Sequence, residues 1–138
     1  MAERIIQGKV IVEGTGQGAV LVLPEPLSLW GGLNPETGMI TDQHHPSCGE
    51  VVTGRVLVMP SGRGSSSASS ILLEAIRLHT APAAIITSEM DGILALGAVV
   101  AQELYGSSLP VLVLKEADYA MLHNDQEITI HRDGVLHL

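Results

Sequence analysis

The stretch GRVLVMPSGRGSSSASSILLEAIRLHTAPAAIIT, residues 54–87, decides the fold. It opens with a short apolar run, residues 54–59, that Pro60 ends, which is the pattern of a buried strand. After the serines, apolar residues recur at intervals of three and four, and this spacing predicts a helix that reaches about Leu78. Residues 83–87 then form a second apolar run. A strand, a helix and a strand in this order favour parallel strands joined by a right-handed crossover.

The same alternation continues toward the C-terminus. Residues 92–106 predict a second helix with Gly106 as its C-terminal cap, and residues 110–114 predict another buried strand. Ser88 and Asp91 have the spacing of a capping box, which predicts the start of this helix. The middle of the chain therefore alternates between strand and helix, as expected for an α/β fold.

Both ends of the chain have strand patterns instead. Residues 4–12 and 18–23 are rich in Val, Ile and Leu, and the stretch GTGQGA, residues 14–19, predicts a hairpin turn between them. A short helix is predicted at residues 117–122, and after it EITIH and GVLHL flank the turn RDG, which predicts a hairpin that could pair with the N-terminal strands. We expect an α/β fold with a mixed, β-rich sheet and two or three helices, in one domain over residues 1–138.

A long irregular segment, residues 27–49, interrupts this order. It contains turn-forming Gly, Pro, Asn and Asp at close spacing, with one short strand predicted at residues 39–41. Loops of about twenty residues inside a compact domain are usually functional, so this segment is a candidate for part of a site.

Two adjacent histidines, His44 and His45, lie in this loop near Asp42 and Cys48. Their spacing matches no structural zinc site, so they are either metal ligands of another kind or hydrogen-bonded side chains of a polar loop. Cys48 is the only cysteine of the chain, whereas an iron–sulfur cluster usually needs about three or four thiolates. We therefore expect this chain to bind no metal by itself.

The composition argues against several classes of function. With 46% hydrophobic residues, 16% charged residues and a mean hydropathy of +0.33, the chain has the composition of a globular protein rather than a disordered one. A net charge of −8 and only three scattered aromatic residues argue against nucleic acid as a partner. No apolar segment approaches the roughly 20 residues of a membrane span, and no signal peptide is evident, so we expect a cytoplasmic protein without a membrane partner.

The serine-rich stretch SGRGSSSASS, residues 61–70, leads from the predicted strand into the predicted helix. It lacks the Gly-Lys-Ser/Thr end of a P-loop and the G-x-S-x-G pattern of a serine hydrolase. From the local pattern, Ser65 is either the N-cap of the helix or part of an anion-binding loop. In the second case Gly62 and Gly64 would allow close approach of the backbone, and the Arg63 guanidinium would bind a carboxylate or phosphate.

Four longer stretches together resemble one family, the small swivelling-domain subunits of the aconitase X enzymes. They are PLSLWGGLNPETGMITDQHHP (26–46), GRVLVMPSGRGSSSAS (54–69), APAAII (81–86) and ILALGAVVAQELYG (93–106). The resemblance implies a swivelling β/β/α fold, in agreement with the mixed sheet predicted above. It also implies a dehydratase formed with a larger subunit, which holds an iron or iron–sulfur centre.

The resemblance further implies roles for the serine stretch. The G-x-G-S-S-R loop of the aconitase superfamily matches residues 62–67, which implies that Ser65 is the catalytic base. Ser67 stands where the superfamily has an arginine that would bind a further carboxylate, so a citrate-like substrate is not expected. The substrate-binding residues that we expect are Arg63, Gly64, Ser66, Ser67 and His45.

Members of the aconitase X family dehydrate either cis-3-hydroxy-L-proline or 5-phosphomevalonate. Trp30 and the pair His45-Pro46 are more similar to the hydroxyproline enzymes, so cis-3-hydroxy-L-proline is the expected substrate and 5-phosphomevalonate is the alternative. In the implied reaction, Ser65 as an alkoxide removes the proton α to a carboxylate, while the partner's metal acts as a Lewis acid on the β-hydroxyl. This subunit would then be inactive alone.

Two functions of other classes remain open at this point. A swivelling domain can carry a phosphoryl group on a histidine, here His44 or His45, although ITDQHHPSC lacks the Thr/Ser-rich surroundings of such carriers. The chain could also be a non-catalytic binding module. Acid-labile phosphate on His45 would support the carrier, and the absence of a large-subunit partner would support the binding module.

Overall fold

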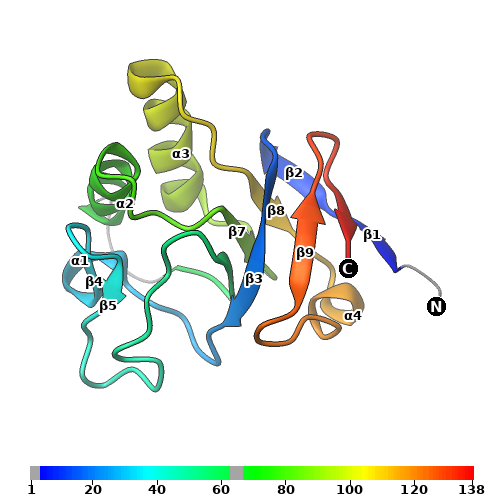
Figure 1. Cartoon of the computed structure of the whole chain (residues 1–138), viewed down its shortest axis with the longest axis horizontal. Helices are drawn as coiled ribbons and strands as arrows, with labels where there is room; N and C mark the ends of the chain where they lie inside the picture. Colours follow the sequence, from blue (N-terminus) through cyan, green and yellow to red (C-terminus); the bar gives the residue numbers. More distant parts are fainter. Residues whose placement is uncertain (1–3, 63–66) are drawn as a thin grey trace.

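The chain folds around one large mixed sheet (Figure 1). The computed structural model describes residues 4–62 and 67–138, and all elements named below belong to these two ranges. A small separate hairpin consists of β4 (Leu33–Asn34) and β5 (Met39–Ile40). The strands of the large sheet are β1 (Ile5–Gln7), β2 (Lys9–Val12), β3 (Gly16–Val22), β6 (Val56–Met59), β7 (Ala84–Thr87), β8 (Val111–Val113), β9 (Glu127–Ile130) and β10 (Val135–His137).

The order of the strands across the large sheet is β1-β10-β9-β3-β6-β7-β8-β2. The neighbours β3, β6, β7 and β8 run parallel, and the remaining pairs are antiparallel. The predicted C-terminal hairpin is confirmed, because β9 pairs with β10 and the two strands join β3 and β1 of the N-terminal part. The expected mixed sheet of an α/β fold is thereby confirmed.

The described ranges contain four helices, where the sequence predicted two or three. They are α1 (Leu29–Gly32), α2 (Ser67–Arg77), α3 (Gly92–Tyr105) and α4 (Glu116–Tyr119). The additional helix is α1, which lies in the predicted long loop and whose backbone is not helical at Trp30 and Gly31. The crossover helices α2 and α3 lie side by side on one face of the sheet (Figure 1). Within the two described ranges, no helix is long and apolar enough to cross a membrane.

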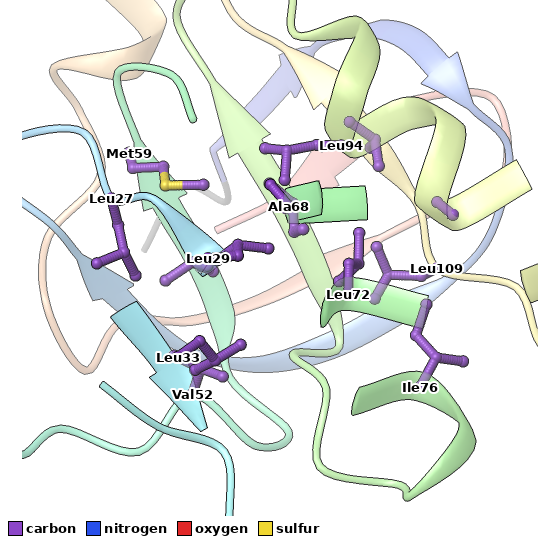
Figure 2. Close-up of a cluster of buried hydrophobic side chains, with 14 of the residues drawn as sticks. Leu27, Leu29, Leu33, Val52, Met59, Ala68, Leu72, Ile76, Leu94 and Leu109 are labelled. Carbon is purple, nitrogen blue, oxygen red and sulfur yellow. The ribbon is translucent and has the colours of Figure 1, made fainter. Parts of the chain in front are cut away.

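The central strands β6 and β7 are buried along their whole length. The side chains of β6 alternate between two cores. Leu57 and Met59 belong to the core beneath α2 and α3, where Figure 2 labels Met59, and Val56 and Val58 belong to the core on the other side, where Leu122 packs. A strand that is covered on both faces has no polar positions, which explains the continuous apolar run in the sequence.

The hairpin turn predicted at residues 14–19 is wrong. β2 pairs with β8, whereas β3 pairs with β6 and β9, so the strands on either side of GTGQGA are not neighbours. Gly16 and Gly18 lie within β3, and a Cβ atom at Gly16 would come 2.7 Å from the carbonyl oxygen of Ala83. These glycines therefore allow the close approach of another backbone instead of forming a turn.

The capping box predicted at Ser88 and Asp91 is also wrong, although the helix that it was to start is confirmed as α3. Asp91 itself is the N-cap, because its Oδ1 accepts hydrogen bonds from the N–H groups of Ile93 (3.0 Å) and Leu94 (3.1 Å). Ser88 takes no part in this cap, since its N–H and its hydroxyl both donate to the carbonyl oxygen of Pro60.

Candidate functional site

The carboxyl ends of three parallel strands meet at one edge of the sheet. Because β3, β6 and β7 are parallel neighbours, the segments that follow them begin side by side, at residues 23–29, 60–62 and 88–91. In open α/β sheets, ligands bind outside the carboxyl ends of the strands. The serine stretch follows β6, so it starts at this edge.

Hydrogen bonds join the segments that follow β6 and β7. The carbonyl oxygen of Pro60 accepts three hydrogen bonds of 3.2 Å, from the N–H and the hydroxyl of Ser88 and from the N–H of Glu89. The buried hydroxyl of Thr87 donates to the carbonyl oxygen of Glu89 at 2.6 Å. The ends of the two strands therefore form one connected unit.

Gly62 is held from two sides. Its N–H donates to Oδ2 of Asp91 at 2.7 Å, a length typical of a hydrogen bond to a charged acceptor. On its other side, Gly62 forms a parallel bridge with Leu27, in the segment after β3. A Cβ atom at Gly62 would lie only 2.5 Å from Oδ2 of Asp91, so a larger residue here would displace the Asp91 carboxylate. All three segments thus meet at Gly62, next to the residues predicted to do the chemistry.

A small cavity of about 80 Å³ lies beside Gly62. Small-molecule sites usually have volumes of about 300 Å³ or more, so this cavity can accept only part of a substrate. Five of the seven residues that line it are apolar, and they come from the segment after β3 and from the helices α2 and α3. Leu27, Leu29, Ala68 and Leu94 of this lining are labelled in the buried cluster of Figure 2. The cavity is lined by Leu27, Leu29, Gly62, Ala68, Asp91, Ile93 and Leu94.

Two large apolar side chains are exposed next to residues that line the cavity. Trp30, which follows Leu29, is 62% exposed, and Met90, which precedes Asp91, is 66% exposed. Exposed apolar surface that forms a patch around a site is typical of a surface that another molecule covers. The edge of the sheet therefore has the features of an incomplete site.

The predicted site residues Arg63, Gly64, Ser65 and Ser66 lie outside the described residues. Ser67 is the first residue of α2, and the next residue along the helix, an alanine, lines the cavity. Gly62 also lines the cavity, so the residues on both sides of positions 63–67 in the chain, Gly62 and Ala68, contact the same cavity. The roles predicted for Ser67 and for the four residues before it stay predictions.

His45 is buried, with 4% of its surface exposed. Its Nδ1 accepts a hydrogen bond from the N–H of Ser47 at 3.0 Å, which assigns the ring proton to Nε2, and Nε2 donates to the carbonyl oxygen of Glu25 at 3.1 Å. The bond to Glu25 ties the long loop to the turn after β3. A phosphoryl group on either nitrogen would break one of them, which argues against a carrier role for His45. Its predicted contact with the substrate stays a prediction.

Asp42 and His44, next to His45 in the loop, belong to a turn. Oδ1 of Asp42 accepts a hydrogen bond from the N–H of His44 at 2.9 Å, and Cys48 is exposed. Over residues 4–62 and 67–138, no group of three or more His, Cys, Asp and Glu side chains is arranged to hold a metal ion. Asp42, His44, His45 and Cys48 therefore do not come together as a set of metal ligands.

Asp91 is the site residue that the sequence patterns did not reveal. Its spacing from Ser88 suggested a capping box, but an aspartate directly before an apolar helix is also the signal of an N-cap. Its contact with Gly62 joins residues that are 29 positions apart in the chain. No local pattern in the sequence reports a contact of that kind.

Comparisons with known proteins point to one family, because a family model described as the aconitase X swivel domain matches residues 5–138. Cis-3-hydroxy-L-proline dehydratase of Pseudomonas aeruginosa is 44% identical over 136 residues, which cover 94% of this chain and 23% of that protein. The phosphomevalonate dehydratase small subunit of Methanothermobacter thermautotrophicus is 37% identical over 126 residues, which cover 91% of this chain and 92% of that subunit. The crystal structure of Thermococcus kodakaraensis aconitase X in its holo-form matches with a TM-score of 0.85 and 30% identity over 96% of each chain. This chain thus spans about a quarter of the length of the Pseudomonas relative and nearly all of the Methanothermobacter subunit.

Proposed function

The chain belongs to the aconitase X swivel-domain family, and on this premise we propose that it is the small subunit of a dehydratase in which Ser65 is the catalytic base. In this proposal residues 1–138 form one swivelling domain that works with a larger subunit in the cytoplasm. The observation that carries the proposal is that Gly62, the first residue of the matching loop motif, and Ala68, the residue directly after it, line one cavity at the carboxyl ends of parallel strands.

Ser65 can remove a proton only if its alkoxide form is stabilised. In the chain it stands two residues before the start of α2, and the first N–H groups of a helix stabilise a nearby anion by about 0.3–1 kcal/mol. Arg63 would add a full positive charge. The alkoxide takes the proton on the carbon next to the substrate's carboxylate, the electrons of that C–H bond form a double bond, and the β-hydroxyl leaves.

The other residues of the stretch bind the substrate in this proposal. Arg63 holds the carboxylate through its planar guanidinium, and the backbone of Gly64 approaches the substrate closely because it has no side chain. Ser66 and Ser67 donate hydrogen bonds. The largely apolar cavity wall limits the water near the alkoxide, which strengthens the electrostatic interactions at this position.

We assign the iron or iron–sulfur centre implied by the family to the larger subunit. The described parts of this chain offer no set of three His, Cys, Asp and Glu side chains for a metal ion, and the single cysteine, Cys48, is exposed. These residues do not fit an iron centre. The departure of the hydroxyl therefore depends on groups that the larger subunit supplies.

The larger subunit would also complete the walls of the site. The cavity of about 80 Å³ accepts only part of a substrate, and Trp30 and Met90 expose apolar surface at its edge. Covering these side chains would remove apolar area from water and close the site around the substrate. We propose that this surface, Trp30 and Met90, faces the larger subunit.

The proposed substrate is cis-3-hydroxy-L-proline. The hydroxyproline dehydratase of Pseudomonas aeruginosa has the higher identity of the two relatives, 44% over 136 residues against 37% over 126 residues. Ser67, in place of an arginine, argues against a citrate-like substrate but suits both candidates, because each has a single carboxylate. The alternative is 5-phosphomevalonate, which is favoured by the length of the phosphomevalonate dehydratase small subunit, since this chain covers 92% of it.

Co-expression with the larger subunit tests the proposal. We expect Ser65→Ala to lower kcat for dehydration by about 100-fold to 10,000-fold, because the general base is lost. Ser70→Ala is the matched control, because Ser70 is an exposed residue of α2 and its variant should keep the activity of the parent complex. Near-normal turnover by the Ser65→Ala complex would contradict the role of Ser65. Turnover of 5-phosphomevalonate alone would replace the proposed substrate by the alternative.

A further inference from the structure

We propose that Asp91 is a positioning residue for the serine stretch, because its carboxylate ties Gly62, where that stretch begins, to the start of α3. The inference rests on the proposed role of Ser65. Oδ2 of Asp91 accepts the N–H of Gly62 at 2.7 Å, and Oδ1 accepts the N–H groups of Ile93 and Leu94 at 3.0 and 3.1 Å. The half-buried carboxylate therefore holds two segments at once.

The bond to Gly62 is more than α3 needs. A helix cap requires one side-chain oxygen, and Oδ1 of Asp91 already fills this role. Serine has only one oxygen, and asparagine has one oxygen and one NH₂ group, which cannot accept a hydrogen bond from an N–H. Among the good capping residues, aspartate alone can cap α3 and bind Gly62 through separate oxygens.

Asp91 is attached to a rigid element. α3 has 14 residues and buries Leu94, Ala98 and Ala101 in the core, so its first turn has a fixed position against the sheet. The bond of 2.7 Å from the N–H of Gly62 to Oδ2 holds Gly62 close to this first turn. A catalytic group that is displaced by about 1 Å can lose about 100-fold in rate. Ser65 follows Gly62 by three residues, so the anchor at Gly62 limits where the proposed base can lie.

Asp91→Asn separates the two roles of the side chain. Asparagine caps helices as well as aspartate, so α3 should stay folded and the urea midpoint of unfolding should fall only by the contribution of the lost bond to Gly62. The bond to Gly62 is lost, and in the complex with the larger subunit we expect kcat to fall by about 10-fold to 100-fold while KM changes much less. Asp125→Asn is the matched control: the Asp125 carboxylate also accepts a hydrogen bond, from Arg55 at 2.8 Å, on an exposed turn, and its loss should leave kcat unchanged.

Gly62→Ala tests the same contact from its other side. The added Cβ atom would push against Oδ2 of Asp91, so this variant should also lower kcat. Because both substitutions break one contact, the double variant should lose no more activity than the more impaired single variant. Losses that multiply in the double variant would contradict a shared mechanism and overturn the proposal.

Amide hydrogen exchange gives a readout that does not depend on activity. In the full chain alone, Asp91→Asn should speed exchange at Gly62 by at least about 10-fold, as expected for the loss of a hydrogen bond of about 1.5 kcal/mol or more, while Ile93 and Leu94 stay protected. Parental exchange at Gly62 together with parental kcat would overturn the proposal. Turnover by Ser65→Ala would instead contradict the proposed base, and the exchange result would still decide whether Asp91 anchors Gly62.

Discussion

Gly97 sets the distance between α2 and α3. It is buried within α3, and a Cβ atom there would lie 2.9 Å from the carbonyl oxygen of Ser69, 3.2 Å from Cδ2 of Leu72 and 3.3 Å from Cα of Ser69. Two of these three atoms belong to the backbone of α2, so they cannot rotate away from an added methyl group. We predict that Gly97→Ala lowers the free energy of unfolding, although alanine is the better helix former.

Two opposing contributions give the size of the effect. Replacing glycine by alanine in a helix interior stabilises the helix by about 1 kcal/mol. Inserting a methyl group into a well-packed contact costs about 1–3 kcal/mol, and the higher part of this range applies here because the backbone of Ser69 is the obstacle. The net expectation for Gly97→Ala is a loss of about 1–2 kcal/mol.

Gly92→Ala is the matched control for this substitution. Gly92 belongs to the same helix, and a Cβ atom there would have nothing within 4 Å. The free energy of unfolding of Gly92→Ala should therefore stay unchanged or rise by up to about 1 kcal/mol. Urea denaturation followed by far-UV circular dichroism measures both variants, and they should differ by about 1–3 kcal/mol. Equal stability of the two variants would refute the close approach of α2 and α3.

Two further predictions concern Tyr119 and the proposed subunit interface. Burial raises the pKa of Tyr119 above the ordinary value of 10.0, because the folded state favours the neutral phenol. The stability that the buried neutral side chain provides is therefore complete below about pH 10 and is lost as the pH rises through the raised pKa. In Tyr105→Phe, where Tyr119 is the only tyrosine left, ultraviolet titration should give a midpoint above that of the urea-unfolded chain, and equal midpoints would contradict the burial. Trp30→Ala should weaken binding of the larger subunit at least about 10-fold, measured by calorimetry. Leu104→Ala is the control, because Leu104 is equally exposed but lies at the far end of α3, and its variant should bind with unchanged affinity. Unchanged affinity of Trp30→Ala would exclude this surface from the interface.

The central α/β unit could be predicted from the sequence because its signals are local. β6, β7 and β8 are covered on both faces, so they appear as continuous apolar runs at residues 54–59, 83–87 and 110–114. The end of α3 was equally visible, since Gly106 has a φ of 67°, a left-handed conformation that glycine adopts readily. Propensity, periodicity and capping agree along this part of the chain.

The segment between β3 and β6 was predicted as a loop with one short strand at residues 39–41, which is confirmed as β5, whereas α1 and β4 were not predicted. α1 has four residues, two of them with non-helical backbone, and β4 and β5 have two residues each. Elements this short carry no hydrophobic period. Contacts between distant residues stabilise them, such as the bond from the N–H of Val52 to the carbonyl oxygen of Gly38 and the bond from Nε2 of His45 to Glu25.

The candidate site was predicted in part, and for two different reasons. The roles of Ser65 and its neighbours were predicted from a family resemblance that covers the whole loop motif. Residues 63–66 of this motif lie outside the described residues. The anchor made by Asp91 and Gly62 could not be predicted, because a hydrogen bond between residues 29 positions apart depends on how α3 packs on the sheet. The only trace of this bond in the sequence is the glycine at position 62, which leaves room for the Asp91 carboxylate.

Glycines at close contacts relate both ends of the serine stretch to α3. At the start of the stretch, Gly62 has no side chain and so lets Asp91 of the α3 cap bind its N–H. Near its end, Ser69 of α2 approaches α3 because Gly97 has no side chain either. The helix α3 is therefore the common support of both ends. A substitution at Gly62 or at Gly97 would shift one end of the stretch relative to the other, and the proposed base Ser65 lies between them.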